Sequence, residues 1–101
     1  MGLDIMIYNS EDIKVGMYEI SPNLHDAIFV NTNNWGSYLY LRKIKDYYKA
    51  DVEFQKDDLA KFIIDLKQMT MFISPTNRPA LESLIGLLSE KKVSKIHIAG
   101  D

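Results

Sequence analysis

Apolar residues recur at every second position in two short segments at the start of the chain. These positions are Leu3, Ile5 and Ile7 in the first segment and Ile13, Val15 and Met17 in the second. An alternation of period two is typical of β-strands that bury one face. We therefore predict two strands, over residues 3–8 and 13–18, joined by the polar turn at residues 9–12.

The next apolar segment is short and uninterrupted. Residues 25–30 read HDAIFV, and they follow the turn-forming residues Ser21, Pro22 and Asn23. A short apolar run that begins after a proline turn is typical of a strand. The sequence thus predicts a third strand here and a small antiparallel meander over residues 3–30.

Three later segments carry apolar residues at helical spacing. The stripes are formed by Tyr40, Leu41, Ile44, Tyr47 and Tyr48, by Leu59, Phe62, Ile63, Leu66 and Met69, and by Leu81, Leu84, Ile85 and Leu88. Each stripe predicts an amphipathic helix. Residues 50–55 are read as a brief strand or a connector, and the alternation of Ile96 and Ile98 predicts a last strand.

Together these elements predict one α+β domain over residues 1–101, with a mostly antiparallel small sheet and about three helices packed on one face. A chain of 101 residues, 47% hydrophobic and 26% charged, suits a single globular core. The absence of cysteine excludes disulfides, thiolate metal sites and cysteine nucleophiles. No apolar run is long enough to cross a bilayer and the N-terminus lacks a signal-peptide pattern, so we expect a cytoplasmic protein without membrane contact.

Negative charge is concentrated in the first third of the chain. Residues 1–34 contain five acidic residues and one lysine, whereas residues 35–56 contain five basic and three acidic residues. The acidic residues that we predict to complement a basic partner surface are Glu11, Asp12, Glu19 and Asp26. The basic residues of the middle segment are interleaved with tyrosines, which keeps nucleic-acid binding as an alternative.

Four apolar and aromatic residues are further candidates for partner binding. Trp35 and Tyr38 stand outside the stripe that begins at Tyr40, near a loop, where large aromatic side chains are typical interface anchors. A hydrophobic staple across the start of the helix is an equally consistent role for Trp35. Ile64 and Met71 lie seven residues apart, roughly opposite the main stripe of the second helix. Either that helix is buried on two sides, or Ile64 and Met71 mark a partner surface.

Residues that carry chemistry are few. His25 and His97 are the only histidines, and a histidine pair can cleave RNA by general acid–base catalysis without a metal. We keep such a ribonuclease as an alternative. The sequence contains no metal-ligand spacing, no glycine-rich phosphate loop and no nucleophile-elbow motif, so it predicts no metal site, no cofactor and no catalytic residues.

Two resemblances bear on function. The opening MGLDIMIY, Met1 to Tyr8, resembles the start of a group of small uncharacterised phage and bacterial proteins, which brings no activity with it. In kind, the chain resembles the immunity proteins of bacterial toxin–immunity systems, including contact-dependent inhibition, which are small, often acidic and cytosolic. That resemblance implies a non-enzymatic protein-interaction module that binds and neutralises a toxin domain, for example a nuclease.

Overall fold

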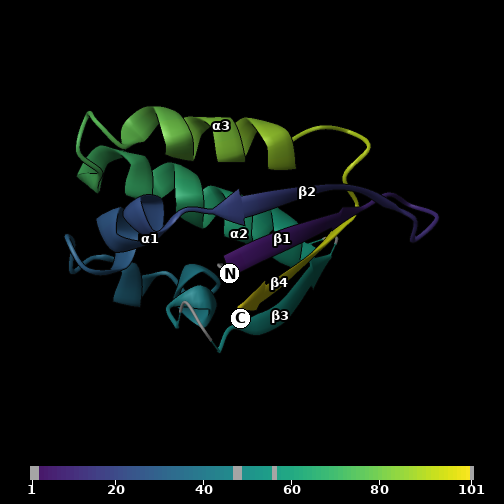
Figure 1. The fold of residues 1–101 in the computed structure, drawn as a ribbon, viewed down its shortest axis with the longest axis horizontal. Coiled ribbons are helices and arrows are strands. Elements are labelled where there is room, and N and C mark those ends of the chain that lie inside the picture. The colour runs from purple at the N-terminus through teal and green to yellow at the C-terminus, as the bar shows by residue number, and fades with distance from the viewer. Residues whose placement is uncertain (1–2, 47–48, 56, 101) are drawn as a thin grey trace.

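The computed structural model describes residues 3–46, 49–55 and 57–100, and in them four strands form one sheet. The strands are β1 (Leu3–Tyr8), β2 (Lys14–Ile20), β3 (Asp51–Gln55) and β4 (Lys95–Gly100). They lie in the order β2-β1-β4-β3, and every neighbouring pair is antiparallel. The last strand therefore lies between the first and third, and Leu3 is opposite Gly100, so both chain ends meet at one end of the sheet (Figure 1).

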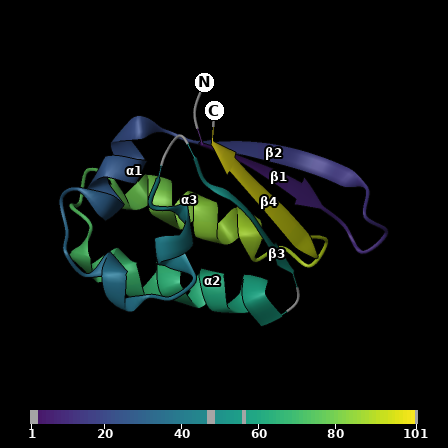
Figure 2. The ribbon, with the colours of Figure 1, turned by 90° about the horizontal axis from the view of Figure 1, so that it is seen from below.

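The helices are α1 (Pro22–Phe29), α2 (Asp57–Met69) and α3 (Arg78–Leu88), with three short 3₁₀ turns, η1 (Trp35–Ser37), η2 (Leu41–Ile44) and η3 (Thr70–Phe72). Figures 1 and 2 show α2 and α3 side by side on one face of the sheet, with α1 at the end away from the β1–β2 turn. The predicted α+β fold with an antiparallel sheet is confirmed. Within the described ranges, no helix has the length and hydropathy needed to span a membrane.

The core lies between the sheet and the two long helices. Its strand residues are Leu3, Ile5, Ile7, Ile20, Phe54, Ile96 and Ile98, and its main helix residues are Phe62, Leu66, Leu81, Leu84 and Leu88. The predicted stripes of the second and third helices are confirmed, because most of their members are buried. Phe54 and Phe62 stack with ring centroids 4.8 Å apart, which joins β3 to α2 at the centre of this layer.

The predicted third strand over residues 25–30 is wrong, since these residues belong to helix α1. Ser21 is the N-cap, and its Oγ accepts a hydrogen bond from the Leu24 amide at 3.2 Å, while Pro22 occupies the first turn. The Ser-Pro pair that was read as a turn is therefore a helix start. The exposed face of this helix is narrow and is carried by Pro22, Asn23 and Asp26. The run over residues 25–30 contains only Asp26 of that face, so it shows too little of a helical period to be distinguished from a strand.

The predicted amphipathic helix that begins near Tyr40 is also wrong. The described part of this segment forms only the one-turn η2, and Tyr47 and Tyr48 lie outside the described residues. Leu41 and Ile44 are buried as the stripe predicted, because positions three apart fall on one side in both an α-helix and a 3₁₀ turn. A residue of another helix stabilises this turn, because Asp65 of α2 accepts hydrogen bonds from the amides of Tyr40 and Leu41 at 3.0 and 3.1 Å.

Replacing the N-cap of α1 tests this account of its first turn. We expect Ser21→Ala to lower the free energy of unfolding by about 1 kcal/mol, because the Leu24 amide loses its acceptor. Ser21→Asp supplies a carboxylate oxygen as acceptor in place of the hydroxyl and should retain most of that stability. Urea unfolding measures both variants, with Ser83→Ala on the exposed side of α3 as a control that changes stability by less than about 0.5 kcal/mol. An unchanged midpoint for Ser21→Ala would contradict the capping role.

Candidate functional site

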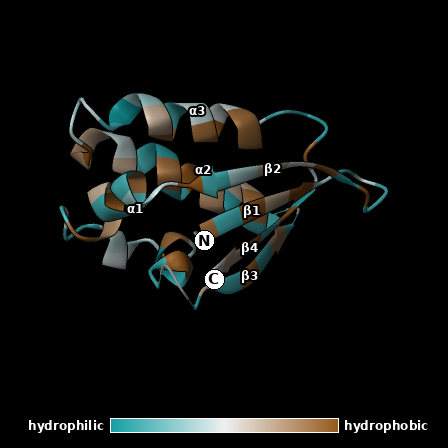
Figure 3. Cartoon of the chain, viewed as in Figure 1, coloured by the Kyte–Doolittle hydropathy of each residue, from teal (hydrophilic) through white to brown (hydrophobic). Residues whose placement is uncertain are grey.

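The face of the sheet that points away from α2 and α3 is the candidate site, and we call it the outer face. The strand register places its side chains in three rows that run across the four strands. The rows are Glu19, Asp4, Ala99 and Asp51, then Met17, Met6, His97 and Glu53, then Lys14, Tyr8, Lys95 and Gln55. Figure 3 shows both hydrophilic and hydrophobic residues along β1 and β2. The register places apolar Met6 and Met17 on the outer face, while Ile5 and Ile7 are buried in the core.

Apolar side chains gather on the β2–β1 half of the outer face. Met17 is 59% exposed and lies opposite half-buried Met6, and Val15, 40% exposed, follows at a β-bulge in the pairing of the two strands. We call Met6, Val15 and Met17 the apolar strip. Ile13, 55% exposed, extends apolar surface into the adjoining turn. Ile13, Val15 and Met17 are the alternating apolar residues from which the second strand was predicted. Their side chains do not fill the core, because the core side of β2 is taken by Tyr18 and Ile20.

Carboxylates border the apolar strip. Asp4 and Glu19 lie directly opposite each other on β1 and β2, and no cationic side chain within the described ranges pairs with either. On the other half of the face, the Nε2 atom of His97 lies 2.6 Å from Oδ1 of Asp51. Lys95 is directed to the turn, where its Nζ atom lies 2.5 Å from Oδ1 of Asp12 and 4.6 Å from the centre of the Tyr8 ring.

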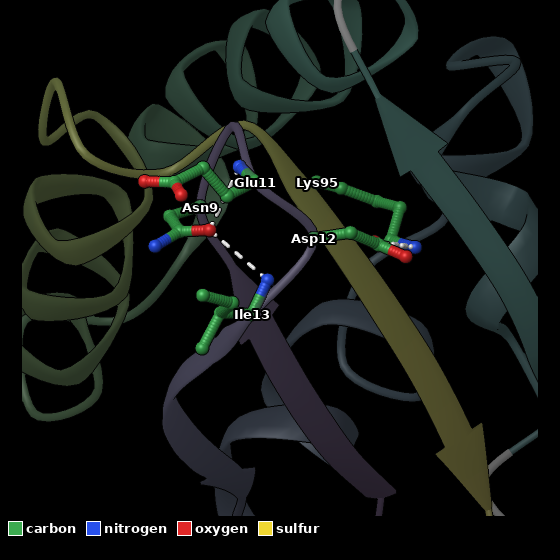
Figure 4. A network of polar contacts seen from close by, with 5 residues as sticks. All are labelled: Asn9, Glu11, Asp12, Ile13 and Lys95. Atoms are coloured by element: carbon green, nitrogen blue, oxygen red, sulfur yellow. Dashed lines mark hydrogen bonds and ion pairs between the residues drawn. The ribbon is translucent and has the colours of Figure 1, made fainter.

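The β1–β2 turn is fixed by side chains, as Figure 4 shows. The Oδ1 atom of Asn9 accepts hydrogen bonds from the amides of Glu11 and Ile13 at 2.9 and 3.0 Å. Asp12 has a φ of 62°, a left-handed conformation that Asp and Asn tolerate better than most residues. The Asp12 carboxylate accepts a hydrogen bond from the Lys95 ammonium and thereby raises the pKa of Lys95 above its ordinary value.

The four acidic residues that we predict to bind a partner lie in two parts of the molecule. Glu11 and Asp12 lie in the β1–β2 turn and Glu19 lies on the outer face, so these three belong to the candidate site. Asp26 is exposed on α1, at the far end of the sheet. Their role in binding remains a prediction, and the structure adds Asp4 and the apolar strip, which the sequence analysis did not select.

Ile64 and Met71 are both exposed, at 50% and 73% of their surfaces, so the alternative of two-sided burial does not apply to them. They do not share one helix, however, because α2 ends at Met69 and Met71 belongs to η3. Ile64 lines a shallow groove of about 410 Å³ between α2 and the segment after α3, together with Ile63, Leu88 and Lys67. This groove lies on the helical side of the molecule, away from the outer face.

Trp35 and Tyr38 pack against the core and are half-buried. The Trp35 ring meets Phe29 of α1 edge-on, with ring centroids 5.5 Å apart, and Nζ of Lys45 lies 5.3 Å from its centre. Both side chains therefore contribute to packing, although they stand outside the apolar stripe that was predicted to begin at Tyr40. A binding role for their exposed parts remains a prediction.

The two histidines are not brought together. His25 lies in α1, is 6% exposed, and its Nε2 atom is 3.2 Å from the carbonyl oxygen of Ile44, on the core side of the sheet. His97 lies on the outer face. A shared catalytic step requires both imidazoles at one substrate, which this arrangement does not offer. Within the described ranges, no three His, Asp or Glu side chains gather closely enough to hold a metal ion.

The packing of Trp35 predicts a cost in stability when the ring is removed. We expect Trp35→Ala to lower the free energy of unfolding by about 1–3 kcal/mol, below the roughly 3–5 kcal/mol of a fully buried aromatic side chain. Trp35→Phe should restore most of the loss, because the edge contact with Phe29 needs only a six-membered ring. Thermal or urea unfolding measures both variants, and an alanine variant as stable as the parent would show that the ring does not support the core.

The Asp12–Lys95 pair predicts a pH effect of defined sign. Because Asp12 raises the pKa of Lys95 in the folded state, the pair contributes stability below the ordinary lysine pKa of 10.5 and loses it as the pH rises through the folded value. Asp12→Asn keeps a residue that tolerates the left-handed backbone but removes the charge. We expect this variant to lower the Lys95 pKa toward 10.5, measured by NMR titration of the Lys95 side chain. Glu11→Gln is the neighbouring control, and an equal effect there would contradict the pairing.

No protein-family model matches the chain, and neither a curated protein nor a solved structure matches it at a significant level. The functional argument therefore depends on the geometry of the outer face.

Proposed function

We propose that the protein is a non-enzymatic protein-interaction module that binds its partner through the outer face. The most concrete form of this proposal is a bacterial immunity protein that covers and neutralises a toxin domain. Its mechanism is steric and electrostatic, because the sheet covers the active site of the partner and this chain carries out no reaction itself. The partner's surface is then unavailable to its own substrate for as long as the complex lasts.

The single observation that carries the proposal is the apolar strip on an uncovered sheet. An antiparallel sheet with one solvated face normally presents polar side chains on that face, because the exposure of apolar side chains to water is unfavourable. Here Met17 and Val15 are turned outward next to Met6, on strands whose other face already supplies the core. Contiguous exposed apolar residues with a polar border are typical of interaction sites.

The dimensions of the face suit a protein partner better than a small ligand. Four strands spaced about 4.8 Å apart and about six residues long make a nearly flat area of roughly 20 by 20 Å. A standard interface covers about 800 Å² on each partner, so it would also take in the adjoining turn with Glu11 and Asp12. The predicted acidic residues of this turn thus fall at the border of such an interface.

The acidic border supports the toxin-neutralising form of the proposal. An active site that acts on nucleic acid is basic, because it must hold phosphates. A carboxylate-rich face that covers such a site replaces the phosphates with its own negative charges and accelerates association through electrostatic steering. Asp4 and Glu19 stand beside the apolar strip, where a basic partner would find both apolar contact and opposite charge.

A site-specific photo-crosslinker tests the proposed binding surface. We would place p-benzoylphenylalanine at Met17 and, as a matched control, at Ser83 on the exposed side of α3, and irradiate cells of the natural host. We expect one stoichiometric protein adduct from position 17 and none from position 83. Met17→Asp, which puts a charge into the apolar strip, should abolish co-purification of that protein while leaving the unfolding midpoint within a few degrees.

Two results would contradict the proposal. Adducts of equal yield from positions 17 and 83 would show that the outer face is not a selective surface. No adduct from position 17, together with an adduct from the groove residue Ile64, would move the binding surface to the helical side and leave the outer face without a partner.

A further inference from the structure

We infer that the outer face receives an arginine of the partner between Asp4 and Glu19, with apolar partner side chains on the apolar strip. This inference rests on the proposed function and names the chemistry of the partner surface. It follows from the way charges are arranged on the four strands, and it distinguishes a basic protein partner from an acidic one and from a second copy of this chain.

Asp4 and Glu19 form a like-charge pair that the fold does not require. Residues directly opposite each other on antiparallel strands have Cβ atoms about 4.5–5.5 Å apart, and two like charges in this position are destabilising. Neither carboxylate has an ion-pair partner within residues 3–46, 49–55 and 57–100. A cation placed between them turns this repulsion into two attractions.

The other charged groups of the outer face already have partners or lie apart. Asp51 contacts His97, and Lys95 contacts Asp12 outside the face. Glu53 lies opposite His97 and acts electrostatically on Lys95. Lys14 lies in the third row, on the far side of Met17 from Glu19. The Asp4–Glu19 pair is thus the place on the described sheet where a partner's positive charge meets two uncommitted carboxylates.

The row next to this pair is apolar, which selects arginine. Met6 and Met17 stand two residues along the strands from Asp4 and Glu19, a distance of about 7 Å. The guanidinium group offers five donors in a planar fork that matches carboxylate geometry, and it is weakly hydrated. Its aliphatic stem packs on apolar side chains while the head stays among polar groups. A single arginine that lies across the apolar strip would therefore pack its stem on Met6 and Met17 and pair its guanidinium group with Asp4 and Glu19.

A second copy of this chain does not fit the same face. Each outer face carries four carboxylates, from Asp4, Glu19, Asp51 and Glu53, against the cations Lys14 and Lys95 on the described strands. Stacking two such faces doubles the excess negative charge instead of neutralising it, and desolvated like charges at an interface cost several kcal/mol. The charge balance therefore commits the face to a basic partner of a different kind.

The test uses the partner captured by the crosslinker at Met17 and measures its affinity for charge variants of the full chain. Asp4→Asn with Glu19→Gln should weaken binding at least roughly tenfold, because the arginine loses both acceptors. The same variant should melt at an equal or higher temperature, because the like-charge pair is gone. The matched control, Glu82→Gln with Glu90→Gln, removes two exposed carboxylates on the helical side and should bind within about twofold of the parent.

A charge swap identifies the arginine. Asp4→Lys with Glu19→Lys should abolish binding, and replacing one arginine of the captured partner by glutamate should restore it, while the same replacement at its other arginines should not. Raising the salt concentration should weaken binding by the parent and much less by the neutral variant.

The outcomes separate this inference from the proposed function. A partner captured at Met17 that binds the neutral variant as tightly as the parent, or that presents an acidic surface, overturns the arginine while the binding face stands. No selective capture at Met17 overturns the proposed function and the inference with it. Loss of binding accompanied by a lower melting temperature would assign Asp4 and Glu19 to the fold and also overturn the inference.

Discussion

The insertion of β4 between β1 and β3 is the constraint on which the rest of this structure depends. Ile96 and Ile98 lie against the helices only because β4 pairs with Ile5 and Ile7 on one side and with Phe54 and its neighbours on the other. This pairing brings together residues from opposite ends of the sequence. Forming it therefore costs the conformational entropy of closing a loop of about 90 residues. It also decides the layers. α2 and α3, which connect β3 to β4, cover one face (Figure 2), and no helix of the described residues covers the other face.

β2 carries apolar residues on both sides, and only one of these sides serves the core. Ile20 faces the core and is buried, and Tyr18 packs on the edge of the core, so this strand already meets the needs of folding. The outward Met17 and Val15 contribute nothing to that layer, and edge strands usually carry charge or a bulge that discourages pairing with other chains. β2 has both a bulge and Lys14 near the turn, so unwanted strand pairing is opposed at the same end where apolar surface is exposed.

The sequence predicts the elements in which apolar residues recur at a clear strand or helix spacing. It does not predict the elements whose conformation depends on contacts with residues distant in sequence. β1, β4, α2 and α3 were predicted because their buried residues repeat at two or about 3.6 positions. α1 is not predicted because its helix is only eight residues long and its exposed face is narrow, with Asn23 and Asp26 as its polar members. η2 is not predicted because Asp65, distant in sequence, accepts hydrogen bonds from the amides of Tyr40 and Leu41. For the site, Glu19 was selected by charge alone. Asp4, Met6 and Met17 were not, because which side of a strand faces outward depends on its pairing partners, and no local pattern encodes the sheet order β2-β1-β4-β3.

The Asp4–Glu19 pair shows how the proposed binding face and a stable fold would place different demands on the same strands. An opposed pair of like charges on an exposed sheet costs roughly 0.2–1 kcal/mol, which is small against a domain stability of about 5–15 kcal/mol. Once a partner excludes water, however, a cation between the two carboxylates interacts at a much lower effective dielectric constant and gains several times that amount. A charge arrangement that is mildly unfavourable in the free protein therefore becomes favourable only in a complex. In the proposed complex, that asymmetry would favour a basic partner, because an apolar or acidic surface would bury the repulsion without relieving it.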